Sequence, residues 1–452
     1  MSAPALSAPA ATVVAGASGE LRRALSLVAV VALVSGNMMG TSIYTLPASL
    51  AGITGPLGML AWIITAAGYY FVAVVYARLG SRYPRSGGPY VYAREAFGDF
   101  AAFLTVWSYW VSAVIGNAAI VTGVVGYMVG LFAPLAGSVV AQFLLAQALL
   151  WSLCWLNVRG VRESASLQTV VMVVTVIPLV AIGLGSLRAF DAANLVPFAP
   201  RGYGSLAAGA ALVVWAYSGV ESATVPAEEV QAPEETIRRG TMLGYSLGTM
   251  VYLLVALAAV GVVPNAELAT SPRPLAVMAE RALGSWAGLV MAFAAIVGGL
   301  GTLNGWTLMA GRIPLSAARD GLFFPAMARI HPERGTPHRA LVLGTVVSSL
   351  MCLLYFSRTL LGVFNFVVLL AVLTTLLPHL FAAAAELLLV RRDPGRFAPA
   401  ERRRTQVIAV IAFAFLLYTV YGAGADVVMW GFLVILGGMP LYVWLRTAPR
   451  RG

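Results

Sequence analysis

Long apolar runs recur along almost the whole sequence, and they leave few folds open to the chain. Each run covers about 20 residues or more, enough to cross a hydrocarbon core of about 30 Å as an α-helix. Of the 452 residues, 60% are hydrophobic and only 10% are charged, less than half the charged fraction usual in a soluble domain. The short alternating strands of a membrane β-barrel are not seen. The sequence therefore predicts an all-α integral membrane protein.

The arginines indicate how the chain crosses the membrane, for which hydropathy predicts about twelve spans. Arginines cluster after alternate spans, at Arg78, Arg159, Arg238, Arg319 and Arg391, whereas loops such as "AGITGP" and "FAPLAG" are uncharged. Because cytoplasmic loops are enriched in Lys and Arg, we expect both termini to be cytoplasmic and the protein to lie in the cytoplasmic (inner) membrane. Topology thus explains the net charge of +11, and we expect no nucleic-acid partner.

Two of the spans contain residues that weaken a helix. They are "LVSGNMMGTSIYTLP", residues 33–47, and "LVVWAYSGVESATVP", residues 212–226. Each places Gly and Ser inside an apolar run and Pro at its end. The two breaks fall in spans one and six, which are corresponding positions of two five-span halves. Such a pair is typical of an inverted-repeat transporter whose site lies near the bilayer midplane.

This spacing divides the chain into four parts. The first, rich in Ala, Ser and Pro, lacks the basic start of a signal peptide, so we expect a disordered cytoplasmic tail. The others are two inverted repeats of five helices each and two additional helices. The predicted bounds are 1–22 for the tail, 23–188 and 204–392 for the repeats, and 405–447 for the last two helices.

Unwound backbone inside a bilayer has N–H and C=O groups that can become ligands. Amides at Gly40, Thr41 and Ser42 would present the positive end of a helix dipole to an anion. Carbonyls at Asn37 and Met38 would accept hydrogen bonds from an ammonium group. The first break therefore suits an amino acid or an amine. The alternative is that the Gly-rich run only lets two helices approach closely.

At these breaks the chain resembles the amino acid-polyamine-organocation superfamily. That family's first-span turn, Gly-x-x-x-Gly-Ser/Thr-Gly followed by an apolar pair and Pro, is matched by "GNMMGTSIYTLP" apart from the third Gly. Within the superfamily, the chain is similar to the bacterial arginine/agmatine antiporter group of basic amino acid and polyamine antiporters. The likeness continues in order through "YPRSGGPYVYARE", "IGNAAIV", "WAYSGVESATV", "GVVPNAEL", "GGLGTLNGWTLMAG" and "ARDGLFFP".

The resemblance implies a five-plus-five inverted-repeat, LeuT-like fold with broken first and sixth helices. It also implies a homodimer that exchanges cationic amino acids for their decarboxylated amines by alternating access. By the same resemblance, backbone amides at Thr41 and Ser42 hold the substrate carboxylate. Carbonyls at Met38 and Ser218 hold the α-amino group.

Aromatic and amide side chains complete the implied pocket. Trp215 and Trp306 match residues that stack on the substrate and gate it, a role that suits the face of a Trp ring toward a cation. Asn117 matches an amide that meets the distal end of the substrate. The other pocket positions implied by the resemblance are Tyr109, Ser112, Ala113, Phe364 and Ala371.

Glu221 is the only acidic residue that we place deep within a span. Ionisable groups at that depth are costly and mark proton or ion pathways, so we expect Glu221 to bind and release protons. In the resembling family, the matching Glu couples pH to transport. We place Tyr76 and His379 with Glu221 in pH coupling and gating.

Three departures from the family pattern bear on the substrate. Ser42 replaces the third Gly of the turn and adds a side chain where a carboxylate approaches, so we expect a preference for amines or small substrates. Ala371 stands where the resembling antiporter has a hydroxyl that faces the distal group. His379 stands where it has a gate tyrosine.

The sequence contains no phosphate-binding P-loop and no intact metal motif, so we expect neither an enzyme nor an ATP-driven pump, and no cofactor or metal. The leading hypothesis is an antiporter whose partners are a small amino acid or amine, protons and membrane lipid. One alternative is a proton-coupled amino acid importer. An alternative of another class is a membrane receptor or accessory subunit that binds without transporting.

Overall fold

The chain forms a bundle of membrane-spanning helices. The computed structural model describes residues 23, 25–356, 360–392 and 399–447, and the side chains of residues 133, 161–169, 355 and 360–366 lie outside that description, as does the predicted tail. Within these residues, 11 helical segments are long and apolar enough to cross a membrane, judged by length and composition. A shorter apolar segment, His338–Leu354, occupies the place of the predicted ninth span. The predicted all-α, multi-pass membrane fold is confirmed.

The helices follow the predicted order of spans, joined by short connecting helices. The first half contains α1 (Leu27–Met38), α2 (Thr41–Ile53), α3 (Gly58–Arg82), α4 (Pro89–Phe97), α5 (Asp99–Leu131), α6 (Ala133–Ala136), α7 (Val139–Arg159) and α8 (Val161–Ser186). The second half contains α9 (Leu206–Tyr217), α10 (Pro233–Val262), α11 (Asn265–Thr270), α12 (Pro274–Leu283), α13 (Ser285–Arg319), α14 (His338–Met351) and α15 (Leu360–Arg392). The C-terminal spans are α16 (Pro399–Gly422) and α17 (Ala425–Leu436) with α18 (Met439–Thr447). Short 3-10 helices are η1 (Gly55–Leu57), η2 (Leu187–Ala189), η3 (Ala192–Leu195), η4 (Tyr203–Ser205), η5 (Ser222–Thr224), η6 (Ala227–Glu229), η7 (Pro325–Ala328) and η8 (Cys352–Phe356).

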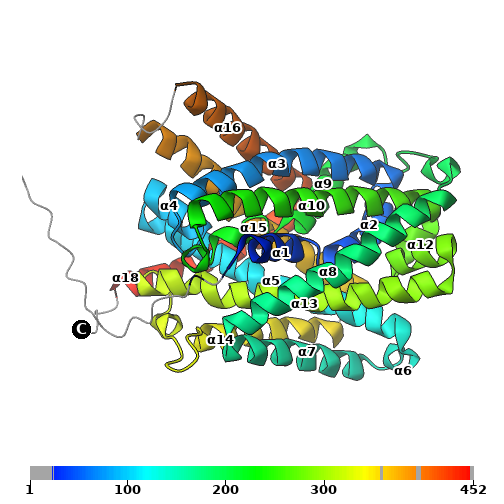
Figure 1. Cartoon of the computed structure of the whole chain (residues 1–452), viewed down its shortest axis with the longest axis horizontal. Helices are drawn as coiled ribbons and strands as arrows, with labels where there is room; N and C mark the ends of the chain where they lie inside the picture. The colour runs from blue at the N-terminus through cyan, green and yellow to red at the C-terminus, as the bar shows by residue number, and fades with distance from the viewer. Residues whose placement is uncertain (1–22, 24, 357–359, 393–398, 448–452) are drawn as a thin grey trace, which may run out of the picture.

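The two halves pack in matched pairs (Figure 1). Helix α3 of the first half lies along its counterpart α10 of the second. Helix α5 of the first half packs along α15 of the second half. In the same way α13, the counterpart of α5, packs along α8, the counterpart of α15. Helix α1 contacts α10, as its counterpart α9 contacts α3. Because five is an odd number of spans, the second half is inverted relative to the first. The boundaries 23–188, 204–392 and 405–447 stay a prediction.

Each half also contains a short helix that leads into its longest span. Helix α4 begins at Pro89 and is separated from α5 by Gly98, whose φ is 85°. Helix α12 begins at Pro274 and is separated from α13 by Gly284, whose φ is 95°. Pro suits a first helical position because the missing N–H would have no partner there. Gly adopts a positive φ at no steric cost. The turns after α4 and α12 therefore have the same local cause.

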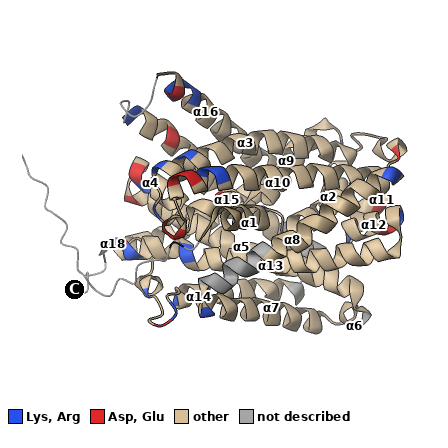
Figure 2. Cartoon of the chain, in the orientation of Figure 1, with Lys and Arg blue, Asp and Glu red and all other residues tan. Residues whose placement is uncertain are grey.

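Charged residues gather toward the two ends of the bundle, and the middle of the long helices is almost uncharged (Figure 2). A charge in the hydrocarbon region is costly, and the few that occur there mark function or are paired. The charge distribution therefore agrees with helices that cross a bilayer along the long axis of the molecule.

Helix α1 approaches α10 closely over a row of glycines. A Cβ atom on Gly244 would lie 2.7 Å from Cβ of Val34, and one on Gly248 would lie 3.0 Å from Cε of Met38. Gly240 makes the equivalent contact with Val30 one turn earlier. The four-residue spacing places the three glycines on one face of α10, and small residues are how membrane helices come close together. This packing positions the end of α1, where the first break begins.

A buried ion pair closes one end of the bundle, beyond the second break. Arg312 of α13 donates to both carboxylate oxygens of Glu229, at 2.8 and 3.1 Å. Their side chains are only 8% and 6% exposed. The backbone carbonyl of Glu229 also accepts a hydrogen bond from the N–H of Leu25, which precedes α1. Glu229 thus contacts α13 through its carboxylate and the residue before α1 through its backbone carbonyl.

We expect Arg312→Met and Glu229→Gln each to reduce the free energy of unfolding by about 3–5 kcal/mol, because either change leaves a charge buried without its partner. Equilibrium unfolding in mixed micelles measures this cost. The control is Arg239→Met, which removes an exposed pair with Glu235 and should cost about 0.5 kcal/mol or less. Equal losses in the buried and exposed pairs would contradict the assignment.

Candidate functional site

The first break separates α1 from α2 at two residues, Met39 and Gly40. A Cβ atom on Gly40 would lie within 2.4–2.6 Å of three side-chain atoms of Thr302 on α13. Only Gly therefore fits while Thr302 keeps this position. The hydroxyl of Thr302 donates to the carbonyl of Gly36 at 2.7 Å, so α13 partners backbone that the helix leaves free.

The second break follows α9 and touches the first. The chain is unwound from Ser218 until η5 begins, and Gly219 has a φ of 112°. A Cβ atom on Gly219 would lie 2.9 Å from Cβ of Asn37. The side-chain amide of Asn37 donates to the hydroxyl of Ser222 at 2.8 Å. The two interrupted spans are therefore directly linked.

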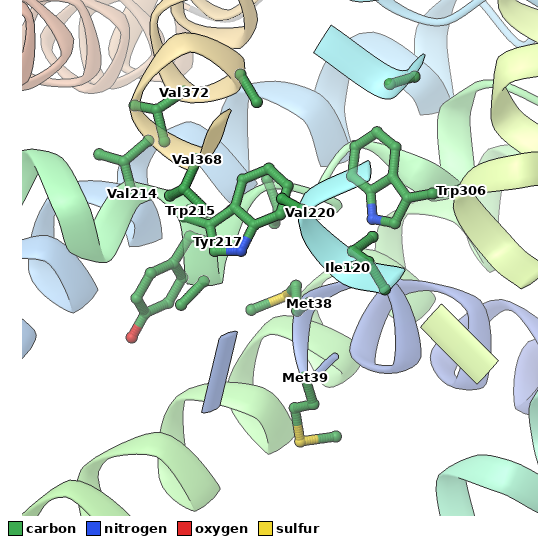
Figure 3. Packing of buried hydrophobic residues seen from close by; sticks show 14 of the residues in the cluster. Met38, Met39, Ile120, Val214, Trp215, Tyr217, Val220, Trp306, Val368 and Val372 are labelled. Atoms are coloured by element: carbon green, nitrogen blue, oxygen red, sulfur yellow. The ribbon is translucent and has the colours of Figure 1, made fainter. Parts of the chain in front are cut away.

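A small cavity of about 10 Å³ lies where the breaks meet. Figure 3 shows Trp215 and Trp306 near Met38 and Ile120, which all line it. Most of the lining was predicted, but Ile120 and Thr302 were missed. Helical spacing could have found them, because Ile120 lies three residues after Asn117 and Thr302 lies four before Trp306. The full lining is Asn37, Met38, Gly40, Thr41, Ser42, Ile120, Trp215, Ser218, Thr302 and Trp306.

Polar atoms at the first break fall into two groups. The indole N–H of Trp306 donates to the carbonyl of Asn37 at 3.2 Å, and the hydroxyl of Ser42 donates to the carbonyl of Met38 at 2.9 Å. In contrast, Oδ1 of Asn37 and the hydroxyl of Thr41 are buried without a hydrogen-bond partner. Buried polar groups are costly to leave unpaired, so these two atoms are candidates to meet a ligand.

Both tryptophans of the cavity are backed by α5. The ring of Trp215 packs on Gly116, where a Cβ atom would lie 2.9 Å from the ring. Trp306 meets Tyr109 edge to face, with ring centroids 6.3 Å apart. The two rings are 7% and 5% exposed. Aromatic rings held in place on a cavity wall suit stacking against a cation or an apolar chain.

A buried polar cluster surrounds Glu221 at the second break. The hydroxyl of Tyr109 donates to Oε1 of Glu221 at 2.7 Å, and the N–H of Gly219 donates to Oε2 at 3.1 Å. Nε2 of His379 lies 3.9 Å from Oε2, and its Nδ1 is hydrogen-bonded to the hydroxyl of Tyr76 at 2.7 Å. The structure thus brings together Tyr76, Glu221 and His379, which the sequence analysis had grouped.

Several predicted pocket residues do not line this cavity. The hydroxyl of Ser112 donates to the carbonyl of Ala371 at 2.9 Å and also contacts the hydroxyl of Thr375, so it joins α5 to α15. Ala113 is buried, and Asn117 is buried with Oδ1 unpartnered. The side chain of Phe364 lies outside the described residues. The substrate contacts of these residues stay a prediction.

Glu221 is not the only fully buried acidic residue among the described residues. Glu386 of α15 is fully buried as well, and Arg78 and Arg82 of α3 lie 3.8 and 4.0 Å from its Oε1. Hydropathy did not indicate that Glu386 is buried, because this residue falls near the arginine-rich end of its apolar run. Its burial comes from the packing of α3 on α15. Among the described residues, no group of three or more His, Cys, Asp or Glu could hold a metal ion.

Comparison with known proteins decides the family. The model of the amino acid permease family matches residues 25–442. The chain belongs to the amino acid permease family. The resemblance drawn from the two breaks and the ordered segments is therefore confirmed, and this permease is a transporter by family, not an enzyme.

Curated relatives of the permease match along most of its length. A putrescine transporter of Haemophilus influenzae is 29% identical over 90% of this chain and 93% of its own. An arginine/ornithine antiporter of Pseudomonas aeruginosa is 30% identical over 94% of this chain and 91% of its own. A cadaverine/lysine antiporter of Escherichia coli is 33% identical over 79% of this chain and 82% of its own.

We expect Trp306→Ala and Trp215→Ala each to abolish transport while leaving folded protein in the membrane. Loss of a stacked cation–π contact should cost about 1–2 kcal/mol in substrate binding, more than tenfold at the upper end. Uptake into vesicles and binding to the purified protein measure the effect. The control is Trp151→Ala on α7, an exposed ring outside the cavity lining. Unchanged uptake by both cavity variants would remove these rings from the pocket.

Proposed function

We propose that this permease exchanges cationic amino acids and the amines derived from them across the cytoplasmic membrane. The observation that carries the proposal is the meeting of two broken spans around one cavity with unpaired polar atoms and two tryptophans. Broken helices of this kind offer amides to an anionic group and carbonyls to a cation. The putrescine transporter and the arginine/ornithine and cadaverine/lysine antiporters support the same substrate class.

Alternating access requires the cavity to open to one side of the membrane at a time, so the bending points and the closing contacts define the mechanism. We infer that Gly40 and Gly219, at the breaks, are the points where the half-spans bend. On the side beyond the second break, the Glu229 and Arg312 pair and the hydrogen bond to Leu25 hold the bundle shut. Opening on that side requires these contacts to separate. The arginine-rich loops favour that side as cytoplasmic, with both termini there.

Proton coupling is the second part of the proposal. Glu221 is fully buried, and among the described residues no arginine pairs with it. The groups that face it are the hydroxyl of Tyr109, the imidazole of His379 and, through His379, Tyr76. A proton or the ammonium of a substrate can therefore serve as its counter-charge. This proposed proton site at Glu221 makes a proton-coupled importer the second candidate function.

The assembly is also part of the proposal. The apolar side chains of α17 include Trp430, Phe432 and Leu433, which are 52%, 58% and 52% exposed. Such a surface suits lipid or a second copy of the chain. The resemblance favours a homodimer, with lipid around it.

The test is exchange in reconstituted vesicles. Vesicles loaded with unlabelled putrescine or ornithine should take up labelled arginine, lysine, ornithine or putrescine, and empty vesicles should not. An importer would instead load empty vesicles under a proton gradient. A receptor would bind ligand and transport nothing. Each result separates the antiporter from one rival.

We expect the affinity for a cationic substrate to rise with pH between about pH 5 and 8, because protonated Glu221 is neutral and cannot pair with a cation. Glu221→Gln keeps the shape but fixes the neutral state, so its affinity should be low and independent of pH. Binding titrations measure both. The control is Glu235→Gln on the exposed face of α10, which should keep the wild-type profile. A wild-type profile in Glu221→Gln would show that the proton site is not Glu221, and His379, 3.9 Å away, would be the next residue to substitute.

A further inference from the structure

The carbonyl end of the first break is occupied by donors from the protein itself. The last four carbonyls of any helix have no partner within it, and in α1 they belong to residues 35–38. The first three of them accept hydrogen bonds in the structure. Their donors are the N–H of Met39, the hydroxyl of Thr302 and the indole N–H of Trp306, at 2.8, 2.7 and 3.2 Å.

The fourth carbonyl, that of Met38, is taken by Ser42. The hydroxyl of Ser42 reaches back four residues across the break and donates at 2.9 Å. It also lies 3.4 Å from the hydroxyl of Tyr252, which donates its own proton to the carbonyl of Ala216 at 2.7 Å. The single proton of Ser42 therefore goes to the nearer acceptor, Met38. Both Met38 and Ser42 line the cavity.

The amide end of the same break is open. Helix α2 begins at Thr41, and Gly40 before it has no side chain to cap the first N–H groups. The hydroxyl of Thr41 also lines the cavity and is 3% exposed, without a hydrogen-bond partner. Free N–H groups at a helix start favour an anion. The break thus offers donors to a carboxylate, whereas each of its facing carbonyls already accepts a hydrogen bond from the protein.

We propose that Ser42 determines substrate specificity by competing with the substrate for the Met38 carbonyl. An α-amino acid carries its ammonium group one carbon from its carboxylate, within reach of that carbonyl when the carboxylate sits at the amides. Because the Ser42 hydroxyl already takes one of the two lone pairs of this carbonyl, the α-ammonium gains less affinity from it. The inference rests on the proposed function and extends its substrate class to acids whose only ammonium is at the far end of the chain.

Three ligands isolate the two ends of the substrate. Ornithine and 5-aminopentanoate differ only in the α-ammonium, and ornithine and putrescine differ only in the carboxylate. We measure their dissociation constants by calorimetry on the purified full-length protein. In the wild type, ornithine and 5-aminopentanoate should bind within a few-fold of each other.

Ser42→Ala removes the hydroxyl and keeps Cβ, whereas Ser42→Gly removes both. If the hydroxyl competes for the carbonyl, both variants should raise the preference for ornithine over 5-aminopentanoate by about tenfold, the effect of one hydrogen bond to a charged group. An unchanged ratio in both variants overturns the proposal. A rise in Ser42→Gly alone also overturns it, because the cause would then be the bulk of Cβ.

Ser35→Ala is the matched control. Its hydroxyl donates to the carbonyl of Val31 at 2.7 Å, the same four-residue reach, and it is buried in the same span outside the cavity lining. It should keep the wild-type ratio, and a tenfold rise there would count against a specific role of Ser42. If wild-type protein binds neither ornithine nor putrescine, the proposed function itself fails, which is a different result from binding with unchanged ratios.

Discussion

Backbone groups that leave a helix inside a bilayer must find partners within the protein, and this requirement organises the structure around the two breaks. Each break has hydrogen-bond partners from another part of the chain. Trp306 and Thr302 of α13 supply donors to the end of α1, and Asn37 bonds Ser222 beyond the second break. Gly219, which has no side chain, lets the two breaks touch. The cavity is the space that these mutual contacts leave unfilled.

The three buried carboxylates among the described residues differ in how their charge is balanced. Glu229 accepts hydrogen bonds from two nitrogens of the Arg312 guanidinium. Glu386 faces Arg78 and Arg82 at longer range. Glu221 has hydrogen-bond donors but no arginine partner among the described residues. An uncompensated charge is costly in the membrane. A proton or a cationic substrate therefore lowers the cost of burying Glu221 more than that of the other two carboxylates.

The first break shows why a family pattern does not transfer whole. The resemblance assigns Met38 a carbonyl for the substrate, yet Ser42 donates to that carbonyl here. Ser42 was expected to act by narrowing the carboxylate end. Its hydroxyl is instead directed to the carbonyl end, because a Ser in the first turn of a helix can reach the carbonyl four residues back. A residue type alone does not say which neighbour its side chain meets.

The sequence by itself determined the membrane class, the order of the spans, both breaks and most of the cavity lining. These are local properties, since hydropathy sets a span and a Gly-rich turn such as Gly40 interrupts it where it stands. Only the tertiary structure decided which groups the breaks meet. Ile120 and Thr302 enter the cavity because α5 and α13 pack against the helices of the first break, and Glu386 is buried because α3 covers it. Those contacts join residues far apart in the chain, and helix periodicity says which side chains share a face but not which helix that face meets.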